Sequence, residues 1–177
     1  LAPGASYQFE QLADATIGSQ QVEVARSMVQ EIDGKVRIAH DLLSACAAHV
    51  EGETFDQGGI QAWLERQDHL LPSFSEGLQV TDAQHRVIAS LGPFEQERLE
   101  KADYAFPLTE ANRLVSLPFE SLSTPNQPAV AQTVPIQAKG HVWGYLSGAF
   151  DLFGPRYLGS YSGRQLRQEG YFSLTAP

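Results

Sequence analysis

Residues 133–152 read TVPIQAKGHVWGYLSGAFDL, and this stretch decides the fold. It predicts two β-strands, Val134–Ala138 and Val142–Leu152, joined by a tight turn at residues 139–140. The second turn residue is glycine, which suits the positive φ angle that such turns require. The run Ala129–Ile136 is a further strand that leads into this hairpin. We therefore expect an antiparallel hairpin at the centre of a sheet.

Side chains of the second strand sort into two sets because successive residues of a β-strand point to opposite faces. The apolar face consists of Val142, Gly144, Leu146, Gly148, Phe150 and Leu152. Its two glycines would let a large group, such as a helix, lie close against it. The other face consists of Trp143, Tyr145, Ser147, Ala149 and Asp151. Its rings, hydroxyl and carboxylate predict the wall of a small-molecule pocket, and a face wetted by solvent is the alternative.

The composition is that of a folded domain and disfavours polyanionic partners. The chain has 177 residues, 42% of them hydrophobic, which is enough for one core or slightly more. It carries 12 basic and 21 acidic residues, a net charge of −9, so nucleic acid and anionic lipid are poor partners. No apolar run approaches the roughly 20 residues that a membrane helix needs. The chain starts at Leu1 without a signal peptide, and we expect it to be part of a longer protein.

Apolar residues recur at steps of three and four over residues 22–50, which predicts one long helix. The seam consists of Val22, Ala25, Val29, Ile32, Val36, Ala39, Leu43, Cys46 and Val50. We expect the C-terminal half of this helix to cover the sheet and the N-terminal half to form a homodimer with a second copy. A helix buried wholly along its own domain is the alternative. Cys46 lies on the seam, which predicts a buried, unreactive thiol.

Shorter elements follow the long helix. Residues 58–70 predict a short helix, and residues 78–81 and 87–90 predict a β-hairpin. His85 lies in the turn of this hairpin, where histidine tolerates left-handed backbone. Residues 103–118 show no clear period, and we expect them to form a loop over the pocket face.

The order of these elements resembles the Cache family, the PAS-like extracytoplasmic sensor domains of bacterial transmembrane receptors. The resemblance is carried by the long helix, the hairpin VTDAQHRVIAS, and the pairing of SLPFESLSTPNQPAVAQTVPI with KGHVWGYLSGAFDL. The C-terminal run GRQLRQEGYFSLTAP resembles the first strand of the membrane-proximal lobe of double-Cache sensors. The resemblance implies an α+β fold: a PAS-like five-stranded antiparallel sheet, the long N-terminal helix packed on one face and a ligand cavity on the other.

The resemblance also implies a domain organisation and a function. We expect a stalk and dimerisation helix over residues 1–52, a ligand-sensing lobe over 53–155, and a linker with the first strand of a second lobe over 156–177. The implied function is a periplasmic small-molecule sensor of a membrane-anchored bacterial diguanylate cyclase, histidine kinase or chemoreceptor, coupling ligand binding to helix rearrangement. A degenerate, ligand-free dimerisation module of such a receptor is the alternative.

A ligand would lie between the 104–119 loop and the pocket strand. The candidate ligand-binding residues are Tyr104, Phe106, Arg113, Phe119, Trp143, Tyr145, Ser147 and Asp151. Amino-acid-binding Cache domains carry an Arg-x-Trp-Tyr element in this loop and an aspartate where Ala149 stands here, and Phe119 replaces a frequent tyrosine. The resemblance therefore implies a small-molecule ligand that is not clearly an amino acid, with Asp151 as the candidate replacement for the aspartate.

The sequence contains no recognisable enzyme motif. The run GSYSG at residues 159–163 has Tyr161 at its centre, where G-x-S-x-G requires a serine. The H-E-x-x-H, Walker and C-x-x-C patterns do not occur. We expect no catalytic residue, no metal and no cofactor in this chain, although the full-length protein is free to carry a catalytic output domain. A hydrolase-like enzyme is the least favoured alternative.

Overall fold

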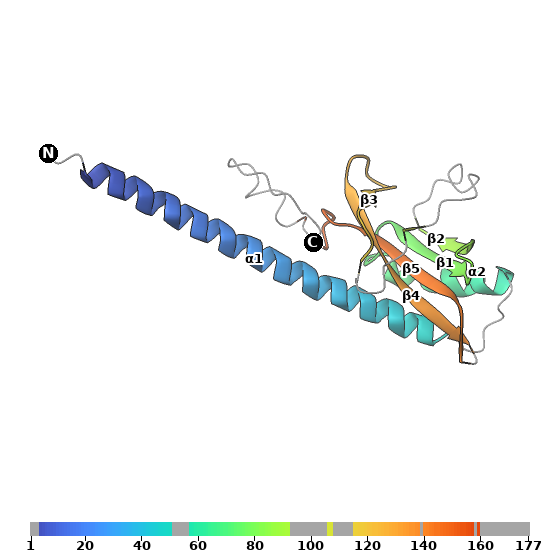
Figure 1. Cartoon of the computed structure of the whole chain (residues 1–177). Helices are drawn as coiled ribbons and strands as arrows, with labels where there is room; N and C mark the ends of the chain where they lie inside the picture. Colours follow the sequence, from blue (N-terminus) through green and yellow to red (C-terminus); the bar gives the residue numbers. More distant parts are fainter. Residues whose placement is uncertain are drawn as a thin grey trace. The chain divides into compact units, whose positions relative to one another are not determined.

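The computed structural model describes residues 4–50, 57–92, 106–107, 115–138, 140–157 and 159, with side chains of the first helix from Val22 onward. Its helices are α1 (Gly4–Ala48), α2 (Gln57–Glu65) and the short 3₁₀ helix η1 (Asp68–Leu70) (Figure 1). Its strands are β1 (Gly77–Asp82), β2 (Val87–Leu91), β3 (Phe119–Glu120), β4 (Pro128–Ala138) and β5 (His141–Asp151). The predicted site residues Tyr104 and Arg113, and the strand of a second lobe expected within the run GRQLRQEGYFSLTAP, lie outside the described residues.

The described strands form one five-stranded sheet in the order β2-β1-β5-β4-β3, and every neighbouring pair is antiparallel. The hairpin predicted to be central is central, because β5 lies between β1 and β4. Gly140 in its turn has φ 79°, and His85 in the β1–β2 turn has φ 63°, as the turn chemistry predicted. The α+β class and the antiparallel sheet inferred from the sequence are confirmed.

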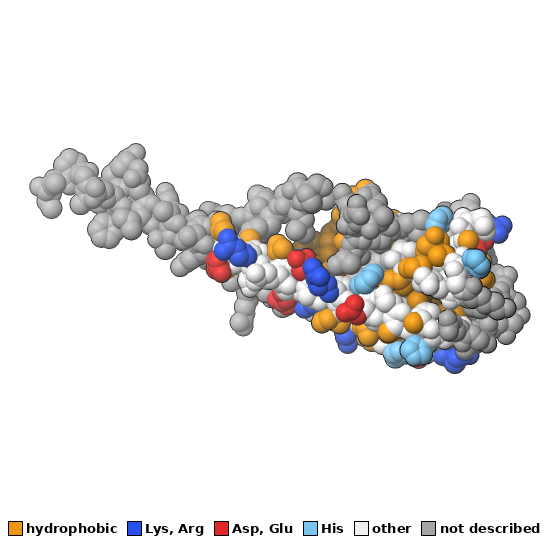
Figure 2. Space-filling model, turned by 60° about the horizontal axis from the view of Figure 1, so that its bottom comes forward, with side chains coloured by type: hydrophobic (Ala, Val, Ile, Leu, Met, Phe, Trp, Pro, Cys, Tyr) orange, Lys and Arg blue, Asp and Glu red, His pale blue; other side chains and the backbone are white. Residues whose placement is uncertain are grey.

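The chain divides into two compact units between Lys35 and Val36, inside α1. In the first unit the seam residues Val22 and Val29 are 58% and 50% exposed. Lys35 pairs with a glutamate one turn earlier, and Figure 2 shows charges of both signs alternating with hydrophobic side chains along this helix surface. Of the described helices, none is both long and apolar enough to cross a membrane.

In the second unit, the C-terminal part of α1 lies against one face of the sheet, which we call the helix face. The helix face consists of Leu78, Val80, Val130, Gln132, Val134, Ile136, Gly144, Leu146, Gly148 and Phe150, which share a side by register. From α1, the side chains of Val36, Ala39 and Leu43 are buried. The buried Gln132 Nε2 donates a hydrogen bond to the Val36 carbonyl at 2.8 Å, which fixes the helix to β4. Apolar burial and one amide bond therefore join helix and sheet.

Helix α2 covers the edge strand β2. Its apolar residues Ile60, Trp63 and Leu64 are buried. The Gln61 side chain bonds both backbone groups of Ser90: its Nε2 donates to the carbonyl at 3.1 Å, and its Oε1 accepts from the N–H at 3.2 Å. An edge strand otherwise presents unpaired backbone groups that invite association with another chain. The amide of Gln61 satisfies one such pair.

The two glycines of β5 make room for neighbours other than the predicted helix. A Cβ atom at Gly148 would meet the ring of Phe74 at 2.5 Å, and a Cβ atom at Gly144 would meet the Thr81 carbonyl oxygen at 2.2 Å. Phe74 is fully buried and packs on Phe150, with ring centroids 6.3 Å apart. Glycine is therefore required at these two positions because an aromatic ring and a neighbouring strand, rather than α1 itself, leave no room for a side chain.

Two β-bulges interrupt the sheet at the same end. Between Val80 and Thr81 the β2 partner moves from residue 89 to residue 87, so Ile88 is an extra residue. Where β4 pairs with the start of β5, the partner moves from Gly144 to residue 142, so Trp143 is also an extra residue. The predicted alternation holds from Gly144 to Asp151 and fails at Val142, which is 44% exposed, because a bulge shifts the facing by one residue.

Candidate functional site

The sheet face opposite the helix face carries most of the predicted site residues, and we call it the polar face. Register places its side chains in rows across β1, β5 and β4. The first row is Thr81, Tyr145 and Pro135, the second is Gln79, Ser147 and Thr133, and the third is Gly77, Ala149 and Ala131. Two rows that bear hydroxyls and an amide thus lie beside one row of small apolar residues.

Each residue of the second row makes a side-chain hydrogen bond. The hydroxyls of Ser147 and Thr133 lie 3.0 Å apart and share a hydrogen bond. The Gln79 Oε1 accepts a hydrogen bond at 2.9 Å from the backbone N–H of Phe106, which ties the 106–107 segment to the sheet. Gln79 and Ser147 are each only 2% exposed. Gln79 and Ser147 are therefore buried, hydrogen-bonded polar groups in this row.

The first row contains a buried hydroxyl that has no hydrogen bond within the described part of the chain. Thr81 is 2% exposed, and its Oγ1 has no partner there. Two other buried side-chain atoms share this condition, His40 Nδ1 and Gln132 Oε1, but they belong to α1 and to the helix face. Gln132 also makes a bond through its other amide atom, whereas the Thr81 hydroxyl makes none. Among the described residues of the polar face, Thr81 is thus the one with a buried, unsatisfied side-chain atom.

The β1–β2 turn contacts the first row at Tyr145. The ring of His85 stacks on the ring of Tyr145, with centroids 4.9 Å apart and planes at 29°. His85 itself has a left-handed backbone, with φ 63°. Tyr145 is half-buried.

The third row is filled by the chain's own apolar side chains. Ala131 and Ala149 are fully buried, with Phe106, Phe119 and Leu122 packed on them. The rings of Phe106 and Phe119 lie 6.1 Å apart. Ala149, for which the resemblance to amino-acid-binding Cache domains implied an aspartate, is therefore part of an apolar cluster.

A buried carboxylate that the sequence did not single out anchors this cluster. Glu76 is fully buried, and its Oε1 accepts hydrogen bonds from the hydroxyls of Ser121 at 2.7 Å and Ser123 at 2.5 Å. Its Oε2 accepts from the backbone N–H groups of Leu122 at 2.6 Å and Ser123 at 3.1 Å. The backbone N–H of Glu76 donates to the Ala149 carbonyl at 3.0 Å. Glu76 therefore joins the turn that carries Leu122 to the start of β1.

Asp151 stands at the end of β5 and closes a turn. Its Oδ1 accepts a 2.7 Å hydrogen bond from the Phe153 backbone N–H, the pattern of an Asx turn. Its own N–H donates to the Ser75 hydroxyl at 3.1 Å. One carboxylate oxygen of Asp151 is therefore engaged in local structure, beyond the row of Ala149.

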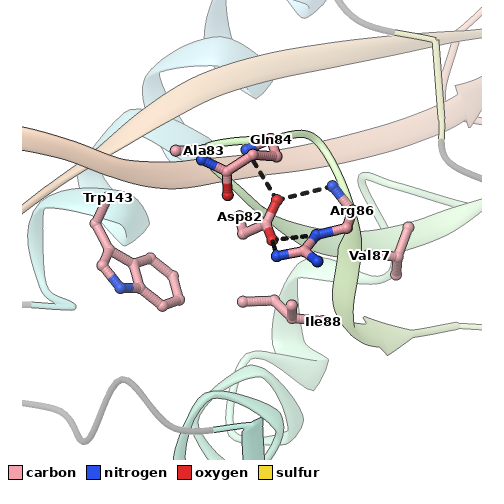
Figure 3. Close-up of a pocket in the computed structure, with 7 residues that line it drawn as sticks. All are labelled: Asp82, Ala83, Gln84, Arg86, Val87, Ile88 and Trp143. Atoms are coloured by element: carbon pink, nitrogen blue, oxygen red, sulfur yellow. Dashed lines mark hydrogen bonds and ion pairs between the residues drawn. The ribbon is translucent and has the colours of Figure 1, made fainter.

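Trp143 lines a cleft at the hairpin end of the sheet rather than the polar rows. The cleft has a volume of about 500 Å³ and is lined by Asp82, Ala83, Gln84, Arg86, Val87, Ile88 and Trp143 (Figure 3). Arg86 donates to Asp82 Oδ2 from Nε at 2.8 Å, with its Nη2 2.7 Å from the same oxygen. The Arg86 backbone N–H, together with its guanidinium and the Gln84 N–H, holds the pKa of Asp82 below its usual value. Asp82 is therefore ionised and paired at neutral pH.

The structure brings four of the eight predicted residues together on the polar face: Phe106, Phe119, Tyr145 and Ser147. Trp143 and Asp151 lie at its two ends. Sequence reasoning missed Gln79, Thr81, Thr133 and Glu76. The alternation of β1 could have indicated Gln79 and Thr81, because these polar residues alternate with Leu78 and Val80.

Two other groups with shifted pKa values, Cys46 and Tyr157, make hydrogen bonds within the fold. Burial raises the pKa of the Cys46 thiol to about 11, and the thiol donates to Gln67 Oε1 at 3.4 Å. Burial likewise raises the pKa of Tyr157, whose hydroxyl donates to the Ser73 carbonyl at 3.0 Å. Cys46 is therefore a protonated, weakly nucleophilic thiol at neutral pH. Within the described ranges, no cluster of three or more His, Cys, Asp or Glu side chains could hold a metal ion.

No protein-family profile and no curated protein sequence matches the chain. Among solved structures, the ligand-binding domain of the Pseudomonas fluorescens chemoreceptor CtaA, in complex with L-serine, matches with a TM-score of 0.52 and 14% identity over 78% of this chain. The ligand-binding domain of the Pseudomonas aeruginosa amino acid chemoreceptor PctC, in complex with GABA, matches with a TM-score of 0.49 and 17% identity over 69% of this chain. The periplasmic domain of Vibrio cholerae LuxQ matches with a TM-score of 0.37 and 16% identity over 71% of this chain and 64% of its own.

The chain spans 61% of the CtaA structure and 59% of the PctC structure, or about three fifths of each. With a TM-score above 0.5 and 14% identity, the match to CtaA shows a shared fold. The predicted PAS-like sheet with a long N-terminal helix is confirmed, and the chain shares the fold of the CtaA ligand-binding domain.

Proposed function

We propose that the chain is an extracytoplasmic small-molecule sensor domain of a bacterial transmembrane signalling protein, with its ligand on the polar face. The fold supports this, since the CtaA domain with the same fold belongs to a chemoreceptor and holds L-serine. The parent protein would be membrane-anchored, with the chain in the periplasm and a signalling output in the cytoplasm. Residues 1–52 would serve as stalk, 53–155 as sensing lobe and 156–177 as the start of a second lobe.

The observation that carries the proposal is the buried Thr81 hydroxyl, which has no hydrogen-bond partner within the described ranges of the chain. Burying a hydroxyl without a hydrogen bond costs about 1–3 kcal/mol, so native structures rarely keep one without a reason. Tyr145 lies opposite Thr81 in the same row, and Gln79 and Ser147 lie in the next. A small polar solute that bonds to Thr81 Oγ1 would recover this energy on binding.

The same strand can pass the effect of binding to the helix. Thr81 and Val80 are neighbours on β1, and Val80 is fully buried on the helix face, beneath the layer that contains α1. A ligand that prefers one position of β1 therefore also favours one packing of the helix layer. Coupling of this kind typically amounts to about 1–3 kcal/mol, which is sufficient for signalling.

The test is Thr81→Val with Thr133→Val as its matched control. Thr81→Val removes an unsatisfied hydroxyl, so the free protein should be as stable as the wild type or more so, while ligand affinity falls by roughly fivefold to tenfold. Thr133→Val removes a hydroxyl bonded to Ser147 and should lower stability by about 1 kcal/mol. Ligands would be found by thermal-shift screening of amino acids, amines, sugars and carboxylic acids, and affinities measured by calorimetry.

Two results would count against the proposal. If Thr81→Val binds the ligand as the wild type does, the ligand lies elsewhere. If none of the solutes raises the melting temperature, the ligand-free dimerisation module becomes the better interpretation, with the Phe106 and Phe119 cluster as its filled cavity.

We also propose that the N-terminal part of α1 forms the homodimer contact. Val22 and Val29 are one heptad apart and exposed, whereas Val36 on the same seam is buried within the second unit. Val22→Glu with Val29→Glu should abolish a dimer in sedimentation analysis. Ile38→Glu is the control, since Ile38 is 63% exposed but off the seam. If Ile38→Glu alone dissociates the dimer, the opposite side of the helix is the interface.

A further inference from the structure

The cleft at the hairpin end is built by the two β-bulges. Ile88 is the extra residue of β2 and Trp143 is the extra residue of β5, and both line the cleft. Bulges occur preferentially next to functional sites because the extra residue redirects a side chain. In Figure 3 the indole of Trp143 lies across the cleft from Ile88 and Arg86. The two bulges therefore direct an aromatic ring and an apolar side chain toward one space of about 500 Å³, a size that suits a small molecule.

The charged rim of this cleft is an ion pair without net charge. Asp82 Oδ1 accepts from the backbone N–H groups of Gln84 and Arg86, both at 2.9 Å, and Oδ2 interacts with the guanidinium. The carboxylate is thus fully engaged. Arg86 uses Nε and Nη2 for Asp82, and its Nη1 has no partner among the residues whose side chains are described. The guanidinium therefore offers a flat face and spare N–H donors, while the ion pair as a whole has no net charge.

We propose that this cleft is a second binding site and that it takes an uncharged planar ring with a hydrogen-bond acceptor at its edge. Trp143 supplies a stacking surface for the ring, and Ile88 supplies apolar contact. Nη1 of Arg86 donates to the acceptor. A carboxylate ligand gains little here, because Asp82 lies beside the guanidinium and the chain has a net charge of −9.

The site is separate from the polar face and does not depend on the sensor proposal. The turn that lines the cleft through Ala83, Gln84 and Arg86 also carries His85, whose ring covers Tyr145. Tyr145 shares its row with Thr81. The turn that lines the cleft therefore contacts, through His85, the tyrosine that pairs with Thr81 by register.

The probe is benzamide, a planar ring with a neutral amide acceptor, titrated against the chain by saturation-transfer NMR and calorimetry. Cyclohexanecarboxamide carries the same amide on a non-planar ring, and benzoate carries the same ring with a negative charge. Benzamide should bind at least fivefold more tightly than either. Trp143→Leu should weaken benzamide binding roughly tenfold, and Trp143→Phe less, because phenylalanine keeps a flat ring. Arg86→Lys should weaken it severalfold through loss of the planar donor.

The two Trp143 variants also protect the test against misfolding, since circular dichroism will show whether each is folded and Trp143→Phe is the milder change. The proposal is overturned if benzamide does not bind at millimolar concentration, or if Trp143→Leu binds it unchanged. Equal binding of cyclohexanecarboxamide would overturn the stacking argument, and tighter binding of benzoate would overturn the charge argument. Thr81→Val should leave benzamide affinity unchanged, and if it lowers that affinity the probe occupies the polar face instead.

Discussion

The two faces of one sheet differ in what holds them. On the helix face, β1, β4 and β5 contribute Leu78, Val80, Val134, Ile136, Leu146 and Phe150, all buried, with Gln132 as the polar exception. On the polar face, the same strands contribute Gln79, Thr81, Thr133 and Ser147. Apolar burial needs no particular partner geometry, whereas a buried hydrogen-bonding group needs one at the correct distance. The helix face is therefore held mainly by packing, with the Gln132 amide as a polar contact to α1, and the polar face is complete only where each group finds a partner.

The two ends of the polar face differ in whether this requirement is met. At the Ala149 end, Glu76 and the apolar cluster occupy the available positions, and every Glu76 oxygen is satisfied. Toward the hairpin, the Thr81 hydroxyl finds no hydrogen-bond partner among the residues that the structure describes. One end of this face is thus built for stability and the other retains an unused donor and acceptor.

Among the variants considered, Glu76→Gln should lower the free energy of unfolding most, because it disrupts the hydrogen bonds at the Ala149 end of the polar face. The glutamine has one acceptor oxygen and one amide group, so donors that now bond the second carboxylate oxygen are left buried without an acceptor. Hydrogen bonds to a charged group contribute about 1.5–3 kcal/mol each, and we expect Glu76→Gln to lower the free energy of unfolding by about 3 kcal/mol. Urea denaturation followed by circular dichroism would measure it.

Glu120→Gln is the matched control for this change. Glu120 is exposed on β3, and its carboxylate accepts one long hydrogen bond of 3.3 Å from the Asn126 N–H. This variant should change the free energy of unfolding by less than about 0.5 kcal/mol. Equal losses in the two variants would mean that Glu76 contributes no more than a surface glutamate, and the account of the stable end would be wrong.

The pattern of the sequence was sufficient for the elements and for the sorting of faces. The three-and-four spacing over residues 22–50 predicted α1, although the structure extends this helix to Gly4. Alternation in β5 placed Tyr145 and Ser147 on the polar face, and the Lys139-Gly140 dipeptide predicted the turn. These features depend on residues that are close in sequence, so a periodic pattern records them.

The partners of the site could not be predicted in the same way. Glu76 meets Ser121 and Ser123 across more than 40 residues, and Thr133 meets Ser147 only because β4 and β5 adopt one register. Trp143 was placed with Tyr145 because alternation was assumed, whereas a bulge moves it to the cleft. Long-range register and bulges are set by the packed sheet, and no local pattern in one sequence reports them.

Adding a methyl group at Gly148 should disturb packing on the helix face and lower the free energy of unfolding by less than Glu76→Gln does. The Cβ atom would approach the fully buried Phe74 ring at 2.5 Å, and overpacking of this kind typically costs about 1–3 kcal/mol. We expect Gly148→Ala to lower the free energy of unfolding by about 2 kcal/mol in urea denaturation. Phe74→Leu should recover part of this loss in the double variant, because a smaller side chain relieves the contact. Additive losses would mean that the ring does not limit this position.

Gly34→Ala should stabilise the protein, the opposite of Gly148→Ala, and its effect should be the smallest of those predicted. Gly34 lies inside α1 with nothing within 4 Å of the position that a Cβ atom would take, so the methyl group meets no obstacle. Alanine is favoured over glycine in a helix by up to about 1 kcal/mol, since glycine loses more backbone freedom. Slower amide hydrogen exchange around residue 34 would show this gain, and global denaturation would show less of it because Gly34 lies outside the unit that contains the sheet. Faster exchange would mean that another group, such as a second copy of the helix, occupies this space. In that case the exposed helix surface, and not only the sheet, contains a close contact that requires glycine.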